Sequence, residues 1–154
     1  FYMINRFEML TTGITQIQKK IQKIKRLKMN SFGLKGAHVM CIYYLHQNPE
    51  GLTAADLSRK CVEDKAAISR ILSELEKNHF IYYEESSLGK KYRAKVKLTL
   101  EGEAYARRIS KVILKITERS SQGISEEERK IFYRVLSIIS ENLDHVCQEL
   151  ESEP

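Results

Sequence analysis

The sequence of 154 residues predicts a mainly α-helical fold with one small β-hairpin, in which a central lobe lies between two long terminal helices. Apolar residues recur at helical spacing over most of the chain, and the longest stretches of this kind lie near its two ends. Near the middle, two short helical patterns are joined by a polar turn. A segment rich in aromatic and β-branched residues, interrupted by turn residues, follows them and favours a hairpin.

The first predicted helix runs from about Ile4 to Lys28. Its apolar residues recur at alternating steps of four and three, close to a heptad spacing. They are Leu10, Ile14, Ile17, Ile21, Ile24 and Leu27. A lone amphipathic helix cannot bury such a stripe by itself, so we expect a second copy of the chain to cover it. Packing within its own subunit is the alternative.

A glycine-containing linker over residues 30–36 leads to a second predicted helix, from about Lys35 to Gln47. An Asn-Pro-Glu-Gly sequence at residues 48–51 ends this helix. Its core candidates are Val39, Ile42, Tyr43 and Leu45. Four of its residues could line a ligand crevice between the terminal helices and the central lobe, or belong to the core instead. They are His38, Met40, Tyr43 and Tyr44.

Residues 53–77 predict a helix-turn-helix. Thr53 can cap the first helix, and Asp56 three residues later completes a capping box. Asp64 can cap the second helix after a short turn. The apolar residues of that second helix fall on one face and are Ile68, Ile71, Leu72 and Leu75. Its opposite face carries small side chains, hydroxyls and cations, as a helix that enters the DNA major groove needs.

The pattern changes to that of a hairpin after the second helix. Residues 80–83 favour a strand, residues 84–89 contain turn residues, and residues 92–98 favour a returning strand. Five basic residues and no acidic one lie between Ser86 and Lys97. They are Lys90, Lys91, Arg93, Lys95 and Lys97. Cations without a local counter-ion repel one another unless something anionic binds, so this run indicates contact with phosphates or the minor groove.

Two further helices complete the chain. Thr99 caps the first of them, whose predicted apolar stripe is Ala104, Ile109, Val112, Ile113 and Ile116. Ser125 and Glu128 form a second capping box and open the long final helix. The apolar side of the final helix contains Phe132, Val135, Leu136, Ile139, Leu143, Val146 and Leu150. We expect the first and last helices to form a dimerisation module.

The order and spacing of these motifs resemble the MarR family of winged-helix transcriptional regulators. The residues that carry the resemblance are Thr53, Asp56, Leu57, Ser58, Ser69, Arg70, Leu72, Leu75, Glu76, Leu98, Thr99 and Gly102. A MarR-like chain would be one domain over residues 1–154, with dimerisation helices at 3–34 and 100–150 and a winged helix-turn-helix lobe at 35–99. Two features depart from the family pattern. His79 stands where Gly is frequent, and residues 89–93 lack the Asp of the family's Asp-x-Arg.

The resemblance and the helix faces together predict a homodimeric regulator that binds a pseudo-palindromic site in double-stranded DNA. Repression is the default outcome, and the resemblance implies release by a small molecule or by thiol oxidation. The candidate DNA contacts are Lys65, Ala66, Ala67, Ser69, Arg70, Ser73, Lys77, Lys90, Lys91 and Arg93. For Arg70 the alternative is an ion pair with Glu74 on a solvated helix face.

A winged-helix module that binds protein partners, and not DNA, is the alternative function. The wing without Asp supports it, as do the acidic residues near the presumed interface. These are Glu74, Glu76, Glu84 and Glu85. Salt dependence separates the two functions, because neutralising DNA phosphates releases counter-ions.

Composition and motifs argue against an enzyme, a cofactor or a metal centre. The net charge of +6 favours an anionic partner only weakly. The four histidines are scattered, and no HExxH, GxSxG or phosphate-binding glycine loop is present. His38 and Cys41 could be two metal ligands, but no third ligand is nearby.

The three cysteines form no CxxC motif, which favours a reducing cytoplasm over a disulfide scaffold. Cys147 lies in the final helix and could form an intersubunit disulfide, although we expect a buried, inert thiol. No apolar run is long enough to span a membrane. We therefore expect a soluble cytoplasmic protein.

Overall fold

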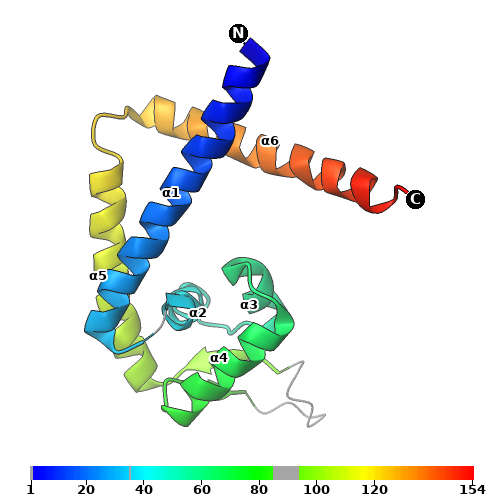
Figure 1. Cartoon of the computed structure of the whole chain (residues 1–154). Coiled ribbons are helices and arrows are strands. Elements are labelled where there is room, and N and C mark those ends of the chain that lie inside the picture. The colour runs from blue at the N-terminus through cyan, green and yellow to red at the C-terminus, as the bar shows by residue number, and fades with distance from the viewer. Residues whose placement is uncertain (1, 35, 85–93) are drawn as a thin grey trace. The chain divides into compact units, whose positions relative to one another are not determined.

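A computed structural model describes residues 2–34, 36–84 and 94–154. Over these residues it confirms the predicted fold class, with helices that dominate and a single antiparallel hairpin (Figure 1). The elements are α1 (Tyr2–Phe32), α2 (Gly36–Gln47), α3 (Ala54–Cys61), α4 (Lys65–Lys77), β1 (Ile81–Tyr83), β2 (Val96–Leu98), α5 (Leu100–Ser120) and α6 (Glu126–Glu151). The first helix is longer than predicted, because it continues through Phe32 into the segment expected to be a linker.

The chain divides into two compact units, Phe1–Lys111 and Val112–Pro154. The first unit contains α1 to α4, the hairpin and the beginning of α5. The second contains the end of α5 and all of α6. That residues 1–154 form one domain stays a prediction.

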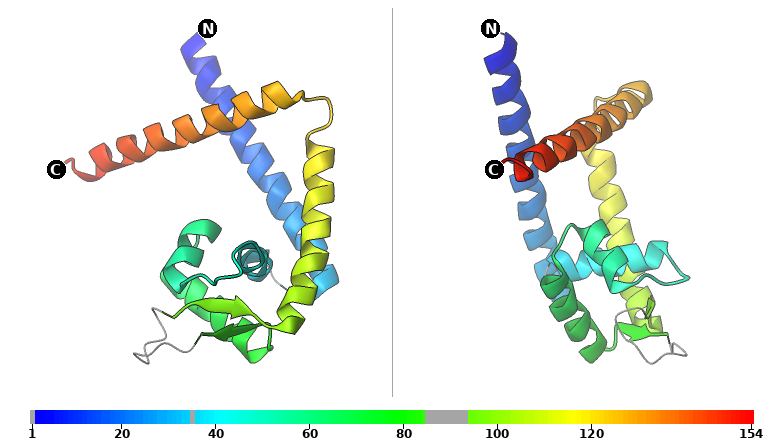
Figure 2. Two further views of the ribbon diagram at one scale, coloured as in Figure 1. Left: turned by 180° about the vertical axis from the view of Figure 1, so that it is seen from behind. Right: turned by 90° about the vertical axis from the view of Figure 1, so that its right-hand side faces the viewer.

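The core of the first unit forms where α2, α3, α4 and the hairpin meet, as the two views in Figure 2 show. The apolar positions predicted for the second helix and the helix-turn-helix are buried there, except Tyr43, which is only half-buried. The largest fully buried side chains are Val39, Ile42, Leu45, Leu57, Ile68, Leu72, Leu75, Val96 and Ile109. Burying one such side chain stabilises the fold by roughly 1.5–3 kcal/mol, so this cluster fixes the orientation of α4.

The hairpin pairs β1 with β2 in antiparallel register, with Ile81 opposite Leu98 and Tyr83 opposite Val96. Leu52 pairs with the other edge of β2, where the Val96 amide donates to the Leu52 carbonyl oxygen at 2.7 Å. Of the returning strand predicted at residues 92–98, Val96–Leu98 form β2, and residues 94 and 95 do not belong to it. Residues 85–93 lie outside the described part of the chain.

The start of α5 is fixed by Thr99 and Gly102. Thr99 Oγ1 accepts a hydrogen bond from the Gly102 amide at 3.0 Å and donates one to the His79 carbonyl oxygen at 2.6 Å. A Cβ at position 102 would lie 2.1 Å from the Phe80 carbonyl oxygen. Only glycine permits this approach, which explains the Leu-Thr-x-x-Gly sequence in physical terms.

The contact at Gly102 also sets which face of α5 is buried. Gly102, Ala106 and Ile109 are buried, at the i, i+4 and i+7 positions of one face. The prediction that Ala104 belongs to the apolar stripe is wrong, because this residue points away from that face and is exposed.

The apolar stripes of the long helices remain exposed in the single chain. On α1 they include Leu10 (38% exposed), Ile17 (54%) and Leu27 (62%). Over the whole of α6, which lies in the described part of the chain, no residue is buried. Within residues 2–34, 36–84 and 94–154, no helix is long and apolar enough to cross a membrane.

Candidate nucleic-acid interface

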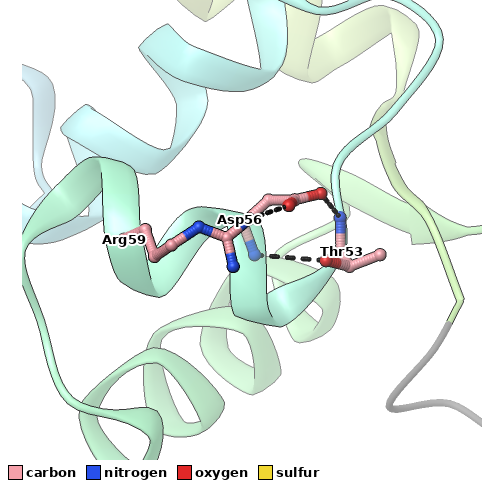
Figure 3. A network of polar contacts seen from close by, with 3 residues as sticks. All are labelled: Thr53, Asp56 and Arg59. Carbon is pink, nitrogen blue, oxygen red and sulfur yellow. Dashed lines mark hydrogen bonds and ion pairs between the residues drawn. The ribbon is translucent and has the colours of Figure 1, made fainter.

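The capping box predicted for α3 is present (Figure 3). The Asp56 amide donates to Thr53 Oγ1 at 3.1 Å, and the Thr53 amide donates to Asp56 Oδ2 at 3.0 Å. Arg59 pairs with the other carboxylate oxygen of Asp56. These hydrogen bonds from Thr53, with a smaller contribution from Arg59, hold the pKa of Asp56 below its usual value. The box therefore fixes the helix that supports α4.

A tight turn joins α3 to α4. Val62 ends α3 in the left-handed region with φ 53°, and the Glu63 amide donates to the Ser58 carbonyl oxygen at 3.1 Å. Asp64 then caps α4, because its Oδ1 accepts from the Ala67 amide at 2.7 Å. The N-caps at Thr53 and Asp64 were predicted from the sequence, and the turn between the two helices places α4 directly after α3 as in a helix-turn-helix.

The face of α4 opposite the core carries the residues predicted to contact DNA. Ile68, Ile71, Leu72 and Leu75 are buried. Ala67 is half-buried near the start of the helix. The exposed candidates are Lys65, Ala66, Ser69, Arg70, Ser73 and Lys77. At a rise of ~1.5 Å per residue these candidates span about 18 Å along the helix. The structure thus gathers them on one surface, with cations near the start, the middle and the end.

Glu74 contacts His38 on α2. The distance from His38 Nε2 to Glu74 Oε2 is 2.5 Å, and the His38 side chain is buried. Among the described residues, His38 Nδ1 has no hydrogen-bond partner and Arg70 forms no ion pair. The alternative in which Arg70 bridges Glu74 is therefore not seen, and the His38–Glu74 contact joins α2 to the C-terminal part of α4.

The hairpin carries part of the predicted basic run. Lys97 Nζ lies 3.1 Å from Glu84 Oε1 across the two strands. The expectation that all five cations lack a local counter-ion is wrong for Lys97, because strand pairing brings Glu84 beside it. Lys95 is exposed. Lys90, Lys91 and Arg93 lie outside the described residues.

The other residues predicted to line a ligand crevice are half-buried on α2: Met40, Tyr43 and Tyr44. The rings of Tyr43 and Tyr44 meet edge to face with centroids 5.4 Å apart, and Lys60 Nζ lies 5.7 Å from the Tyr44 ring centroid. Burial raises the pKa of the Tyr44 hydroxyl. A ligand-binding role for His38 and these three residues stays a prediction.

His38 and Cys41, which the sequence left open as two possible metal ligands, contact different partners. His38 contacts Glu74, whereas Cys41 Sγ lies 3.6 Å from Sγ of Cys61. Among the described residues, no three His, Cys, Asp or Glu side chains are grouped so that they could hold a metal ion. Cys147 is exposed in the single chain, so a second chain would have to cover it if its thiol is buried.

Side-chain pairs that join elements distant in sequence were not predicted. Besides His38–Glu74 and Cys41–Cys61, His46 Nδ1 lies 2.8 Å from Glu103 Oε2 and joins α2 to α5. No local sequence pattern marks such pairs, because helical periodicity shows which face a residue occupies and not which residue it meets.

Comparison with known proteins gives a sequence match in the region of the helix-turn-helix. Residues 32–91 match the model of the MarR family. A search of curated proteins found no match.

Several solved structures have the same fold. NMB1585, a MarR family regulator from Neisseria meningitidis, is 17% identical with a TM-score of 0.81, over 94% of this chain and 97% of that chain. A MarR family transcriptional regulator from Silicibacter pomeroyi is 24% identical with a TM-score of 0.73, over 84% and 86% of the two chains.

The DNA complex of MepR from Staphylococcus aureus is 18% identical to this chain, with a TM-score of 0.75, and the similarity covers 86% of this chain and 96% of that chain. The similarity therefore extends through the long terminal helices. The sequence match to the MarR family model is limited to residues 32–91, whereas the similarity in fold to solved MarR family regulators covers most of the chain.

Proposed function

We propose that this protein is a transcriptional regulator that binds double-stranded DNA in a sequence-specific manner, as a homodimer on a pseudo-palindromic operator. The observation that carries the proposal is the exposed face of α4, where Arg70 lies between Ser69 and Ser73 and has no ion-pair partner among the described residues. An arginine on an exposed helix can donate two hydrogen bonds to guanine in the major groove.

Small residues on the same face support close approach to DNA. Ala66 and Ser69 leave room for the helix to enter the major groove, and the serine hydroxyls can bind either base edges or phosphates.

Cations at the ends of α4 and on the wing can add phosphate contacts. Lys65 and Lys77 lie at the two ends of α4, where they can reach phosphates on either side of the groove. The wing residues Lys90, Lys91 and Arg93 would add contacts to phosphates or the minor groove.

The acidic residues that favoured a protein-binding module are partly engaged within the chain. Glu74 contacts His38, and Glu84 pairs with Lys97. Carboxylates held by internal partners repel DNA less than free ones. These contacts remove part of the argument against DNA binding and favour the regulator over the protein-interaction module.

A homodimer accounts for the exposed stripes of α1 and α6. Large contiguous apolar surfaces on a monomer mark sites of association, and covering them stabilises the complex by about 25 cal/mol per Å². A two-fold dimer would place two copies of α4 about one DNA turn apart, ~34 Å, as a pseudo-palindrome requires.

Occupation of a promoter would block polymerase, so we propose repression as the regulatory outcome and the cytoplasm as the location. Release from DNA would require an effector that binds the dimer, or an oxidant that modifies it, more readily at one spacing of its two DNA-binding lobes than at the other. A small molecule held near His38, Met40, Tyr43 and Tyr44 is one candidate effector.

Operator binding by two arginine variants tests the proposal. A duplex that the purified protein selects from a random pool, or the DNA upstream of its own gene, is titrated with wild type, Arg70→Ala and Arg119→Ala. We expect Arg70→Ala to weaken binding by about 10–100-fold and to reduce the preference over a scrambled duplex, because one bidentate base contact contributes ~1–3 kcal/mol.

Arg119→Ala is the matched control, since it removes the same charge from an exposed site on α5. Its affinity should stay near that of wild type. Equal binding of the selected and scrambled duplexes by all three proteins would refute sequence-specific recognition by α4.

A further inference from the structure

Two cysteines of the first unit lie in contact. Cys41 is in the middle of α2 and Cys61 is the last residue of α3, and their Sγ atoms are 3.6 Å apart. Both are free thiols. The two helices pack against each other, so the contact belongs to the core and not to a chance approach of surface side chains.

The two thiols differ in exposure and in acidity. Cys41 is fully buried, and its hydrogen bond with Cys61, together with burial, raises its pKa. Cys61 is half-buried, and the hydrogen bond from Cys41 lowers its pKa. Lys25 on α1 lowers the pKa of Cys61 further, while burial and Glu63 oppose this shift. Cys61 is thus the more reactive thiol, and Cys41 lies behind it, where its S–H can donate to Cys61 when Cys61 is a thiolate.

We propose that Cys41 and Cys61 are a redox-active dithiol that hydrogen peroxide or an organic hydroperoxide converts into an intrachain disulfide. Cys61 is the thiol that the oxidant attacks, and Cys41 is the thiol that resolves the product. The inference does not depend on DNA binding, because it concerns a modification site within the core of the first unit.

The reaction balances without any further reactant when the oxidant is hydrogen peroxide. The Cys61 thiolate attacks one peroxide oxygen, the O–O bond breaks and hydroxide leaves, which gives a sulfenic acid on Cys61. Sγ of Cys41 then attacks the Cys61 sulfur, the S–O bond breaks, and the hydroxyl leaves as water with the Cys41 proton. The two thiols together lose two electrons and two protons, and hydrogen peroxide is reduced to two molecules of water.

Disulfide formation requires a small displacement in a place where the backbone is already strained. The two sulfur atoms must approach from 3.6 Å to about 2.05 Å. The residue after Cys61 is Val62, a β-branched residue with φ 53°, which is unfavourable for such a side chain. The end of α3 would move toward α2, and the turn that leads into α4 begins at this point.

Mapping of the cysteines after oxidation tests the proposal on the full chain. Wild type is treated with hydrogen peroxide, free thiols are alkylated, and the protein is digested with trypsin. Cleavage after Arg59 and Lys60 places Cys41 and Cys61 on separate peptides. We expect a disulfide-linked pair of these two peptides, with the loss of two alkylatable thiols per chain, and recovery of both after reduction with dithiothreitol.

Variants separate the roles of the two thiols. Cys147→Ser should give the same linked pair, because the exposed thiol on α6 takes no part. Cys61→Ser should leave Cys41 alkylatable at peroxide concentrations that oxidise wild type. Cys41→Ala should accumulate a sulfenic acid on Cys61 that dimedone traps.

If a substitution of buried Cys41 impairs folding, the cysteine mapping of oxidised wild type still tests the proposal. Full alkylation of both Cys41 and Cys61 after peroxide treatment would overturn the proposal. A disulfide from Cys61 to Cys147, or conversion of Cys61 to a sulfonic acid while Cys41 remains free, would overturn it as well.

Discussion

Individual residues at the helix ends of this chain either allow a close backbone contact or adopt an unusual backbone angle. Gly102 meets the Phe80 carbonyl oxygen, and Val62 and His79 adopt positive φ at the ends of α3 and α4. The resemblance to the MarR family already indicated that His79 occupies a position where Gly is frequent. The φ of 64° gives the reason, since glycine reaches this region without steric cost.

Gly102→Ala should destabilise the protein by about 2–3 kcal/mol, because the added methyl group forces α5 away from the Phe80 carbonyl oxygen. Urea unfolding followed by circular dichroism measures the change. Gly13→Ala is the matched control, since no atom lies within 4 Å of the position that its added methyl group would take on α1. It should be neutral or stabilising by ~0.5–1 kcal/mol. Equal effects of the two substitutions would contradict a steric role of Gly102.

His79→Gly should stabilise the protein by about 1 kcal/mol, because it removes the cost of a positive φ at an exposed side chain. The Thr99 hydroxyl would still donate to the carbonyl oxygen of residue 79, which the substitution retains. Thermal unfolding of the variant beside wild type checks this result. A lower melting temperature would show that the imidazole makes a contribution larger than the strain.

For the helices and strands, features that depend on residues close together in the sequence were predicted better than features that depend on distant residues. The capping boxes at Thr53 and Ser125, and the cap at Asp64, were predictable because both partners lie within three residues. Helix faces followed from periodicity, except on α5, where the contact of Gly102 with Phe80 decides the buried face. Residues 94 and 95 were predicted as strand but lie outside β2, since alternation of side chains does not show where pairing begins.

The candidate site was also predictable only in part. The outward face of α4 follows from the burial of its opposite face, so the positions of Ser69, Arg70 and Ser73 could be inferred. The partners of His38 and Cys41 could not, because they lie 36 and 20 residues away in the sequence. Tertiary packing alone brings these residues together.

The capping box of α3 gives an expected pH dependence. The pKa of Asp56 is lowered in the folded state, so its contribution to stability is fully present above the usual value of 3.8 and is lost as the pH falls through the folded-state pKa. Asp56→Ala should cost about 1 kcal/mol at neutral pH. The difference from wild type should shrink progressively below about pH 4.

Urea unfolding at several pH values measures this difference. Asp144→Ala, at an exposed site on α6, provides the control and should show a small effect with little pH dependence. A constant difference between wild type and Asp56→Ala down to about pH 2 would show that the carboxylate does not stabilise α3 through its charge.

At the scale of the whole molecule, the exposed apolar stripes predict a dimer. Light scattering should give twice the chain mass of 17.9 kDa. Ile17→Asp places a charge in the centre of the α1 stripe, where Ile17 is 54% exposed, and should shift the protein toward monomer. Gln18→Asp is the control, because it adds the same charge beside the stripe. A wild-type monomer, or a dimer unaffected by Ile17→Asp, would contradict a role of α1 in association.

The salt dependence of operator binding tests the central claim most directly, because it reports how many phosphates the protein neutralises. Affinities of wild type and Lys65→Ala for the selected duplex would be measured over a series of salt concentrations. We expect a steep linear fall of log affinity with log salt, with a slope of about −0.9 for each phosphate neutralised. The slope of the variant should be shallower by about 0.9 for each phosphate that Lys65 neutralises in wild type. Affinity for duplex DNA that is weak and independent of salt would contradict DNA recognition and leave the protein-interaction module as the function.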